Sequence, residues 1–190
     1  MKRHALIGAL ALALAPLTHA ADSDLDRLMS ALSQHKHGHV RFAEEKHIAM
    51  LDKPVKSSGE WLYDAPDRLE QRTLSPKRET LVLSNGVVTV DRGNRHYTLD
   101  LRQYPQVVPF IESIRATLAG DRAALERVFH LSFEGSFDMW TLTLVPLDAK
   151  LSRNIKQIAI QGTQDAIHQV EILQGDGDRS VLTIGPVVTE

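Results

Sequence analysis

The sequence predicts a mainly β protein in which one helical segment interrupts an antiparallel sheet. Three observations support this class: apolar and polar residues alternate in most segments after residue 38, Asn-Gly and similar pairs separate these segments, and beyond a short N-terminal helix the apolar period lengthens to about 3.6 residues only near the middle. Alternation indicates a sheet with one covered and one solvated face, which is typical of antiparallel pairing. About ten or eleven short strands in this length predict a curled sheet or an incomplete barrel.

The N-terminal segment has the three-part pattern of a secretory signal peptide. Lys2 and Arg3 form a basic start, an Ala- and Leu-rich run follows, and Thr18-His19-Ala20 places small residues at both ends of a cleavage triplet. The apolar run is shorter than the roughly 20 residues that span a bilayer. We therefore predict that residues 1–20 are removed and that residues 21–190 form a single exported domain.

A first helix is expected over residues 23–34, because Leu25, Leu28, Met29 and Leu32 fall on one helical face. Strands should follow, bounded by turn signals; the expected segments are 39–49, 59–63, 80–83, 87–90 and 96–101, and the polar segment 68–74 is ambiguous. The Asn85-Gly86 pair between two apolar runs is the strongest hairpin signal.

The middle of the chain predicts a helical insert of about 25 residues. Its apolar residues repeat at helical spacing up to Gly120, and Asp121 is placed to cap a second helical piece. The C-terminal part returns to alternation, with strands expected over 128–133, 140–145, 157–161, 169–172 and 181–184.

Composition and motifs argue against several functions. The net charge of −2 gives no basic surface for nucleic acid, and the chain has no cysteine for disulfides or nucleophilic catalysis. Neither a Gly-x-Ser-x-Gly elbow nor a Gly-rich phosphate loop is present. Glu44 and Glu45 are adjacent, so on a strand they point to opposite faces and make a poor acid–base pair. We predict that the protein is not an enzyme and needs no cofactor.

Four histidines leave a different function open. In an extended segment His35, His37 and His39 would line one face, with His47 further along, as some transition-metal sites require. No carboxylate or cysteine completes a recognisable spacing, so a solvated connection between helix and strand is the simpler interpretation. A metal-binding protein and a non-catalytic interaction module remain the alternatives to a protein that holds an apolar ligand.

The stretch from Gly38 to Val90 resembles LolA, the family of soluble periplasmic carriers of outer-membrane lipoproteins. The resemblance rests on Val40-Arg41-Phe42, on the run from Ser58 to Leu69, and on Leu81 to Gly86, together with the order of helix, strands, helical insert and strands. The segment 104–121 is more similar to a LolA-related branch than to the housekeeping carrier. One position departs from the family pattern: the family has an arginine before the proline, where it helps to hold a helical lid closed, and here Ala65 precedes Pro66.

The resemblance implies a half-open antiparallel β-barrel of about eleven strands, covered by a helical lid. It also implies a monomeric periplasmic carrier that receives an acylated lipoprotein or other lipid from an inner-membrane export complex and passes it to an outer-membrane acceptor. The sequence does not say whether the cargo is a lipoprotein, a glycolipid or a pigment lipid. We expect the acyl chains to lie in an apolar groove lined by Phe42, Trp61, Tyr63, Leu83, Trp140, Leu142, Ile158, Ile160 and Val170, under a lid that includes Val108, Phe110, Ile111, Ile114 and Leu118.

Overall fold

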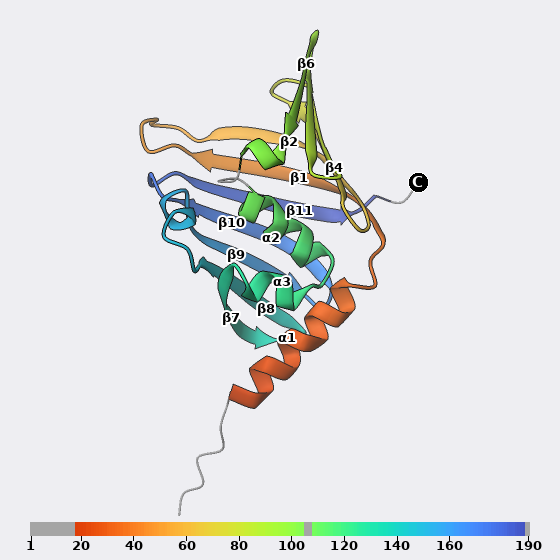
Figure 1. Ribbon diagram of the computed structural model, residues 1–190, viewed down its shortest axis with the longest axis vertical. Coiled ribbons are helices and arrows are strands. Elements are labelled where there is room, and N and C mark those ends of the chain that lie inside the picture. Colours follow the sequence, from red (N-terminus) through yellow and green to blue (C-terminus); the bar gives the residue numbers. More distant parts are fainter. Residues whose placement is uncertain (1–17, 105–107, 189–190) are drawn as a thin grey trace, which may run out of the picture.

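Eleven antiparallel strands form one open sheet in the computed structural model, which describes residues 18–104 and 108–188 (Figure 1). The strands are β1 (His37–His47), β2 (Val55–Asp64), β3 (Arg68–Ser75), β4 (Glu79–Ser84), β5 (Val87–Arg92), β6 (Arg95–Asp100), β7 (Phe129–Ser136), β8 (Met139–Pro146), β9 (Ile155–Thr163), β10 (Ala166–Gln174) and β11 (Arg179–Val187). Their order is β6-β5-β4-β3-β2-β1-β11-β10-β9-β8-β7, so the first and the last strand pair in the middle of the sheet. The predicted fold class, mainly β with a sheet that does not close, is confirmed.

The helices lie together on one side of this sheet (Figure 1). They are α1 (Thr18–Leu32), α2 (Val108–Leu118) and α3 (Arg122–Glu126), with short 3-10 turns η1 (Leu101–Gln103) and η2 (Leu151–Arg153). α1 starts and ends earlier than the expected 23–34 and includes the predicted cleavage triplet in its first turn. The predicted cap of the second helical piece is confirmed, because Asp121 Oδ1 accepts a hydrogen bond from Ala124 N at 2.9 Å.

Local turn chemistry places the β4–β5 hairpin where the sequence predicts it. Asn85 and Gly86 have φ of 51° and 72°, the left-handed values that a tight two-residue turn requires. The ambiguous segment 68–74 is strand β3. Its central Glu70 is buried, and Arg68 and Arg72 each donate to its carboxylate at 2.6 Å. A polar strand is stable here because ion pairing satisfies its buried carboxylate.

Strand register assigns side chains to two faces, because directly paired residues of antiparallel strands project to the same side. Paired apolar residues on one side of the sheet can be followed from β4 to β7, with steps to another residue on the same face at β1 and β11. The pairs are Leu83–Leu69, Leu69–Tyr63, Phe42–Ile184, Leu182–Val170, Val170–Ile160, Ile160–Leu142 and Leu142–Phe133. We call this side, which the helices cover, the inner face and the other the outer face. All nine strand residues that the sequence predicts for the groove lie on the inner face.

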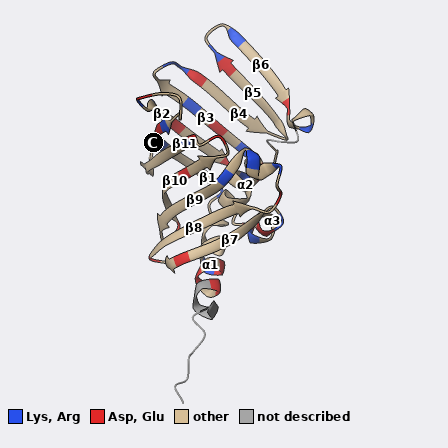
Figure 2. Ribbon diagram, turned by 90° about the vertical axis from the view of Figure 1, so that its left-hand side faces the viewer, with Lys and Arg blue, Asp and Glu red and all other residues tan. Residues whose placement is uncertain are grey.

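Two hydrophobic clusters form on the inner face. The larger joins α1 to β7, β8 and β9 and contains fourteen buried residues, among them Leu28, Leu125 and Leu142. The smaller, at β4, β5 and η1, has three: Leu83, Val88 and Leu101. Charged residues concentrate on β1–β6 and are sparse on β7–β11 (Figure 2). The two ends of the sheet therefore differ in both covering and charge.

Candidate functional site

Helix α2 connects the two clusters. Val108 and Ile111, near its start, pack against the smaller cluster, and Ala116, near its end, belongs to the larger one. Gly120 follows the helix with φ of +64°, and a Cβ there would lie 2.0 Å from the Met29 carbonyl oxygen of α1. Only glycine permits this close approach, which fixes the end of α2 on α1.

The two sides of α2 differ in covering. Ser113, Ala116 and Thr117 are buried, and Thr117 Oγ1 donates to the Ser113 carbonyl at 2.8 Å. Ile114 and Leu118 are only half-buried. At about 100° per residue, the mean directions of these two groups differ by roughly 125° around the helix. The apolar stripe predicted as the lid is therefore not the most buried side.

The position of the helical insert agrees with its prediction as a lid only in part. The helical insert does cover the inner face, as expected. Our sequence reasoning missed the small buried side, although the spacing of Ser113, Ala116, Thr117 and Gly120 was a readable signal for close helix packing. The side chain of Phe110, predicted near the mouth of the groove, lies outside the part of the chain that the structure describes.

The strands that face this stripe expose apolar side chains. Leu69, Leu81 and Val90 surround the smaller cluster and are half-buried. Next along the sheet, the rings of Phe42 and Trp61 meet edge to face, with centroids 6.1 Å apart. Nine apolar residues on the inner face of β1–β5, four of them buried and five half-buried, make up what we call the N-terminal band: Val40, Phe42, Trp61, Tyr63, Leu69, Leu81, Leu83, Val88 and Val90.

Two polar atoms within this band have no partner. Tyr63 Oη and Trp61 Nε1 are buried and make no hydrogen bond to any residue that the structure describes. Tyr63 is 8% exposed, and its ring stands opposite Gly38, the residue with which it pairs on β1. Burial raises the pKa of Tyr63, an effect that Arg115 opposes and Asp67 reinforces.

One end of the band is polar. The Glu44 carboxylate accepts hydrogen bonds from Ser57 Oγ, at 3.0 Å, and from Ser180 Oγ. Glu45 projects to the outer face, where Lys56 donates to it at 2.5 Å and holds the pKa of its carboxyl below the usual value. The two glutamates thus point to opposite faces, as expected. The Glu44 carboxylate is held by hydrogen bonds from two serine hydroxyl groups.

The C-terminal residues predicted for the groove are covered by protein. Trp140, Leu142, Ile158 and Ile160 are 0–5% exposed and belong to the larger cluster, and Val170 packs against it half-buried. Trp140 Nε1 donates to the Gln164 carbonyl at 2.9 Å, so its polar atom is satisfied. The four tightly buried side chains are part of the core in this structure, and Val170 lies at its margin.

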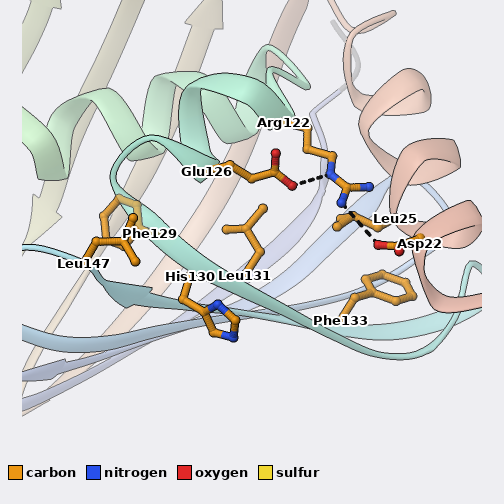
Figure 3. A pocket seen from close by; sticks show the side chains of 9 residues that line it. All are labelled: Asp22, Leu25, Arg122, Glu126, Phe129, His130, Leu131, Phe133 and Leu147. Atoms are coloured by element: carbon orange, nitrogen blue, oxygen red, sulfur yellow. Dashed lines mark hydrogen bonds and ion pairs between the residues drawn. The ribbon is translucent and has the colours of Figure 1, made fainter. Parts of the chain in front are cut away.

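A separate pocket of about 380 Å³ lies between α1, α3 and β7 (Figure 3). Apolar residues Leu25, Phe129, Leu131 and Phe133 line part of it. Arg122 lies at its edge and donates to Asp22 at 3.2 Å, to Asp26 at 2.8 Å and to Glu126 at 2.7 Å. The sequence reasoning did not find this pocket, because its residues are brought together from three separate elements.

The histidines do not converge on a metal site. His35 lies 2.8 Å from Asp165, His37 lies 2.9 Å from Asp64, and His39 Nε2 lies 3.2 Å from Glu60 without hydrogen-bond geometry. His47 is at the opposite end of β1, roughly 33 Å from His37 at ~3.3 Å per residue. Within residues 18–104 and 108–188, no three histidine or acidic side chains are arranged to hold a metal ion.

The helices of the described chain also include none that is long and apolar enough to cross a bilayer. The fold defines a protein of open-sheet architecture. It combines a helix-covered inner face with an apolar band that its helices leave partly bare.

The chain belongs to the LolA-like family of outer membrane lipoprotein carrier proteins, whose family model matches residues 17–187. Similar solved structures include a LolA superfamily protein of Nitrosomonas europaea, with 13% identity, a TM-score of 0.46, and coverage of 90% of this chain and 94% of that one. A domain from Vibrio parahaemolyticus named for outer-membrane lipoprotein sorting has 8% identity, a TM-score of 0.45, and coverage of 88% and 92%. The lipoprotein LppX of Mycobacterium tuberculosis has 10% identity, a TM-score of 0.43, and coverage of 87% and 95%. No curated protein sequence matches significantly.

Proposed function

We propose that this protein is a periplasmic carrier that binds the acyl chains of a lipoprotein or another lipid on the N-terminal band, beneath the apolar stripe of α2. It then transfers that cargo from an inner-membrane export complex to an outer-membrane acceptor. Family membership and the signal-peptide pattern of residues 1–20 support this proposal. The observation that carries it is the half-buried apolar surface that Leu69, Leu81 and Val90 present on the helix-covered side of the sheet.

The physical need for such a surface is large. Exposing a 16-carbon acyl chain to water costs on the order of 12 kcal/mol at ~0.8 kcal/mol per methylene group. A lipid therefore crosses an aqueous compartment only when its chains are shielded. An apolar band between a sheet and a helix shields them without any covalent chemistry, which agrees with the prediction that the protein is not an enzyme.

The C-terminal end of the lid is packed more closely than the rest of it. Gly120 and Ala116 hold α2 against α1 and the larger cluster, and Ile114 and Leu118 remain half-buried on the other side. Arg68, the arginine nearest to Ala65, is bound to Glu70 at 2.6 Å, on the outer face. We infer that contact between α2 and α1 replaces the arginine of the family pattern as the element that positions the lid.

In this proposal the larger cluster is a scaffold. Trp140, Leu142, Ile158 and Ile160 support the inner face from within the core, and the acyl chains contact the N-terminal band and α2. The experiment compares two adjacent half-buried residues of β4: Leu81 on the inner face and Val82 on the outer face. Leu81→Gln should weaken binding of a fluorescent acyl probe about tenfold, because a polar amide replaces a methyl-rich contact. Val82→Gln is the matched control and should bind as the parent does.

The same test includes lipid extraction. Protein purified from its native compartment should carry acylated lipid, which mass spectrometry of the extract would identify as lipoprotein, glycolipid or pigment lipid. A folded protein with no lipid and no probe binding at micromolar concentration would overturn the carrier function. Equal effects of the Leu81 and Val82 substitutions would contradict the location of the site.

A further inference from the structure

Strand β2 places two unsatisfied hydrogen-bonding groups beside each other on the inner face. Three buried side-chain polar atoms lack a hydrogen bond within the described residues, and one of them, His39 Nε2, faces the Glu60 carboxylate on the outer face. The other two, Trp61 Nε1 and Tyr63 Oη, lie in the N-terminal band two residues apart. Tyr63 is more than nine-tenths buried, at 8% exposure.

A buried polar group without a partner destabilises a folded protein, because it has lost its hydrogen bonds to water and gained none. The second tryptophan shows that this fold can satisfy an indole: Trp140 Nε1 donates to the Gln164 carbonyl at 2.9 Å. The missing hydrogen bonds of Trp61 Nε1 and Tyr63 Oη are therefore a feature of the N-terminal band and not of the whole fold. Such exceptions in native proteins call for an explanation, such as local strain, an ordered water or a bound ligand.

The two groups define the chemistry of a partner. An indole N–H is a donor only, and the phenol of Tyr63 carries a proton at neutral pH that it can donate. Both therefore offer a hydrogen to an acceptor oxygen. The nearby cation, Arg115, is already bound to Glu112 at 2.6 Å, and Asp67 adds negative charge close to Tyr63. Because the positive charge of Arg115 is already neutralised and Asp67 repels anions, the two donors favour a neutral carbonyl oxygen over a carboxylate or phosphate oxygen.

We propose that Trp61 and Tyr63 form a polar subsite for the carbonyl oxygens of ester- or amide-linked acyl chains. The inference rests on the proposed function, which supplies the acyl chains, and adds a chemical criterion for the cargo. Chains that carry a carbonyl at their head bind with these two hydrogen bonds, whereas alkyl chains joined by an ether bind by apolar contact alone. The subsite also sets how deep a chain enters, because its carbonyl must stop at β2.

The experiment measures competition of two lipids against a fluorescent acyl probe on the mature chain. The lipids are a short-chain diacylphosphatidylcholine and its dialkyl ether analogue with equal chain length. The parent protein should bind the diacyl lipid about tenfold more tightly, as expected for hydrogen bonds made in a buried site. Tyr63→Phe and Trp61→Phe should each reduce this preference several-fold, because each removes one hydrogen-bond donor to the ester carbonyl. Tyr104→Phe, at an exposed tyrosine, is the matched control and should keep the full preference.

A second readout uses the protein without lipid. Tyr63→Phe should raise the melting temperature, because it removes an unpaired buried hydroxyl group and keeps the ring. Equal affinity of the parent for the two lipids, or a Tyr63→Phe protein that melts earlier and keeps its preference, would overturn the subsite and leave the carrier function intact. Failure of both lipids to bind would overturn the carrier function and the subsite with it.

Discussion

The two ends of the sheet carry the same alternating pattern and bury it to different degrees. At β7–β9, helices α1 and α3 complete a cluster of fourteen buried residues. At β4–β5, three residues are buried, and the apolar side chains around them remain half-buried. The same alternation of apolar and polar residues is therefore buried as a core at one end and left half-buried at the other. The difference comes from where the helices pack.

The two tryptophans show the same contrast at single-residue scale. Trp140 is 2% exposed, its indole N–H is bonded, and its ring lies so close to Gly162 that a Cβ there would be 2.4 Å from Trp140 Cζ2. Trp61 is half-buried and its indole N–H is unbonded. One ring is part of the structural core, and the other remains half-buried.

The largest effect expected from this contrast concerns two leucines. Leu142→Ala, at a side chain with 0% exposure, should lower the free energy of unfolding by about 3 kcal/mol, because it leaves a cavity in the larger cluster. Leu81→Ala, at the half-buried end, should lower it by only about 1 kcal/mol. Denaturant titration of both variants measures the difference. Equal losses would show that the two ends are packed alike.

A smaller effect is expected at the tryptophans. Trp140→Phe removes the bond to Gln164 and leaves space above Gly162, so we expect a loss of about 2 kcal/mol in unfolding free energy. Trp61→Phe removes an N–H that bonds nothing and should change stability by no more than about 0.5 kcal/mol. Thermal unfolding monitored by the remaining tryptophan distinguishes the two. The comparison would fail if Trp61→Phe were the more destabilising change.

The smallest effect concerns alkaline pH and sharpens the position of Tyr63. Burial raises the pKa of Tyr63 above 10.0, the ordinary value for a tyrosine, so the unfolded chain loses the phenol proton before the folded chain does as the pH rises. Stability is unaffected below about pH 10 and then declines until the folded phenol also ionises, by at most about 1.4 kcal/mol per pH unit. Tyr63→Phe lacks this decline. Unfolding free energies at about pH 9 and about pH 11 should therefore diverge between the two proteins; parallel curves would place Tyr63 in contact with water.

Several features could be predicted because they depend on neighbouring residues. Asn85 and Gly86 specify their hairpin through left-handed backbone angles, and Asp121 caps α3 through a bond three residues along. Alternation likewise placed Trp61 with Tyr63, and Leu142 with Trp140, on common faces. The polar strand β3 was ambiguous, because the ion pairs that stabilise Glu70 cannot be read as a periodic signal.

Contacts between elements that are distant in the sequence could not be predicted from local patterns. The Arg122 cluster joins α1 to α3, and Glu44 meets Ser180 across the β1–β11 pair; both depend on contacts between residues about a hundred or more positions apart. The small buried side of α2 follows from its approach to Met29 at Gly120. The groove residues of the C-terminal half were predicted from their hydrophobicity alone. Core residues and ligand-binding residues are both hydrophobic, so this property does not distinguish them.

The sequence by itself determined the strands other than β3, the Asn85-Gly86 turn, the helical insert and the residues that share a face within each strand, because these follow from the backbone period and from local bonds. Only the tertiary structure decided that β1 pairs with β11, which places the two halves on one continuous sheet. It also decided that α1 covers β7–β9 and leaves the N-terminal band to α2. The reason is that helix packing is chosen by the summed fit of distant side chains, which no local pattern contains.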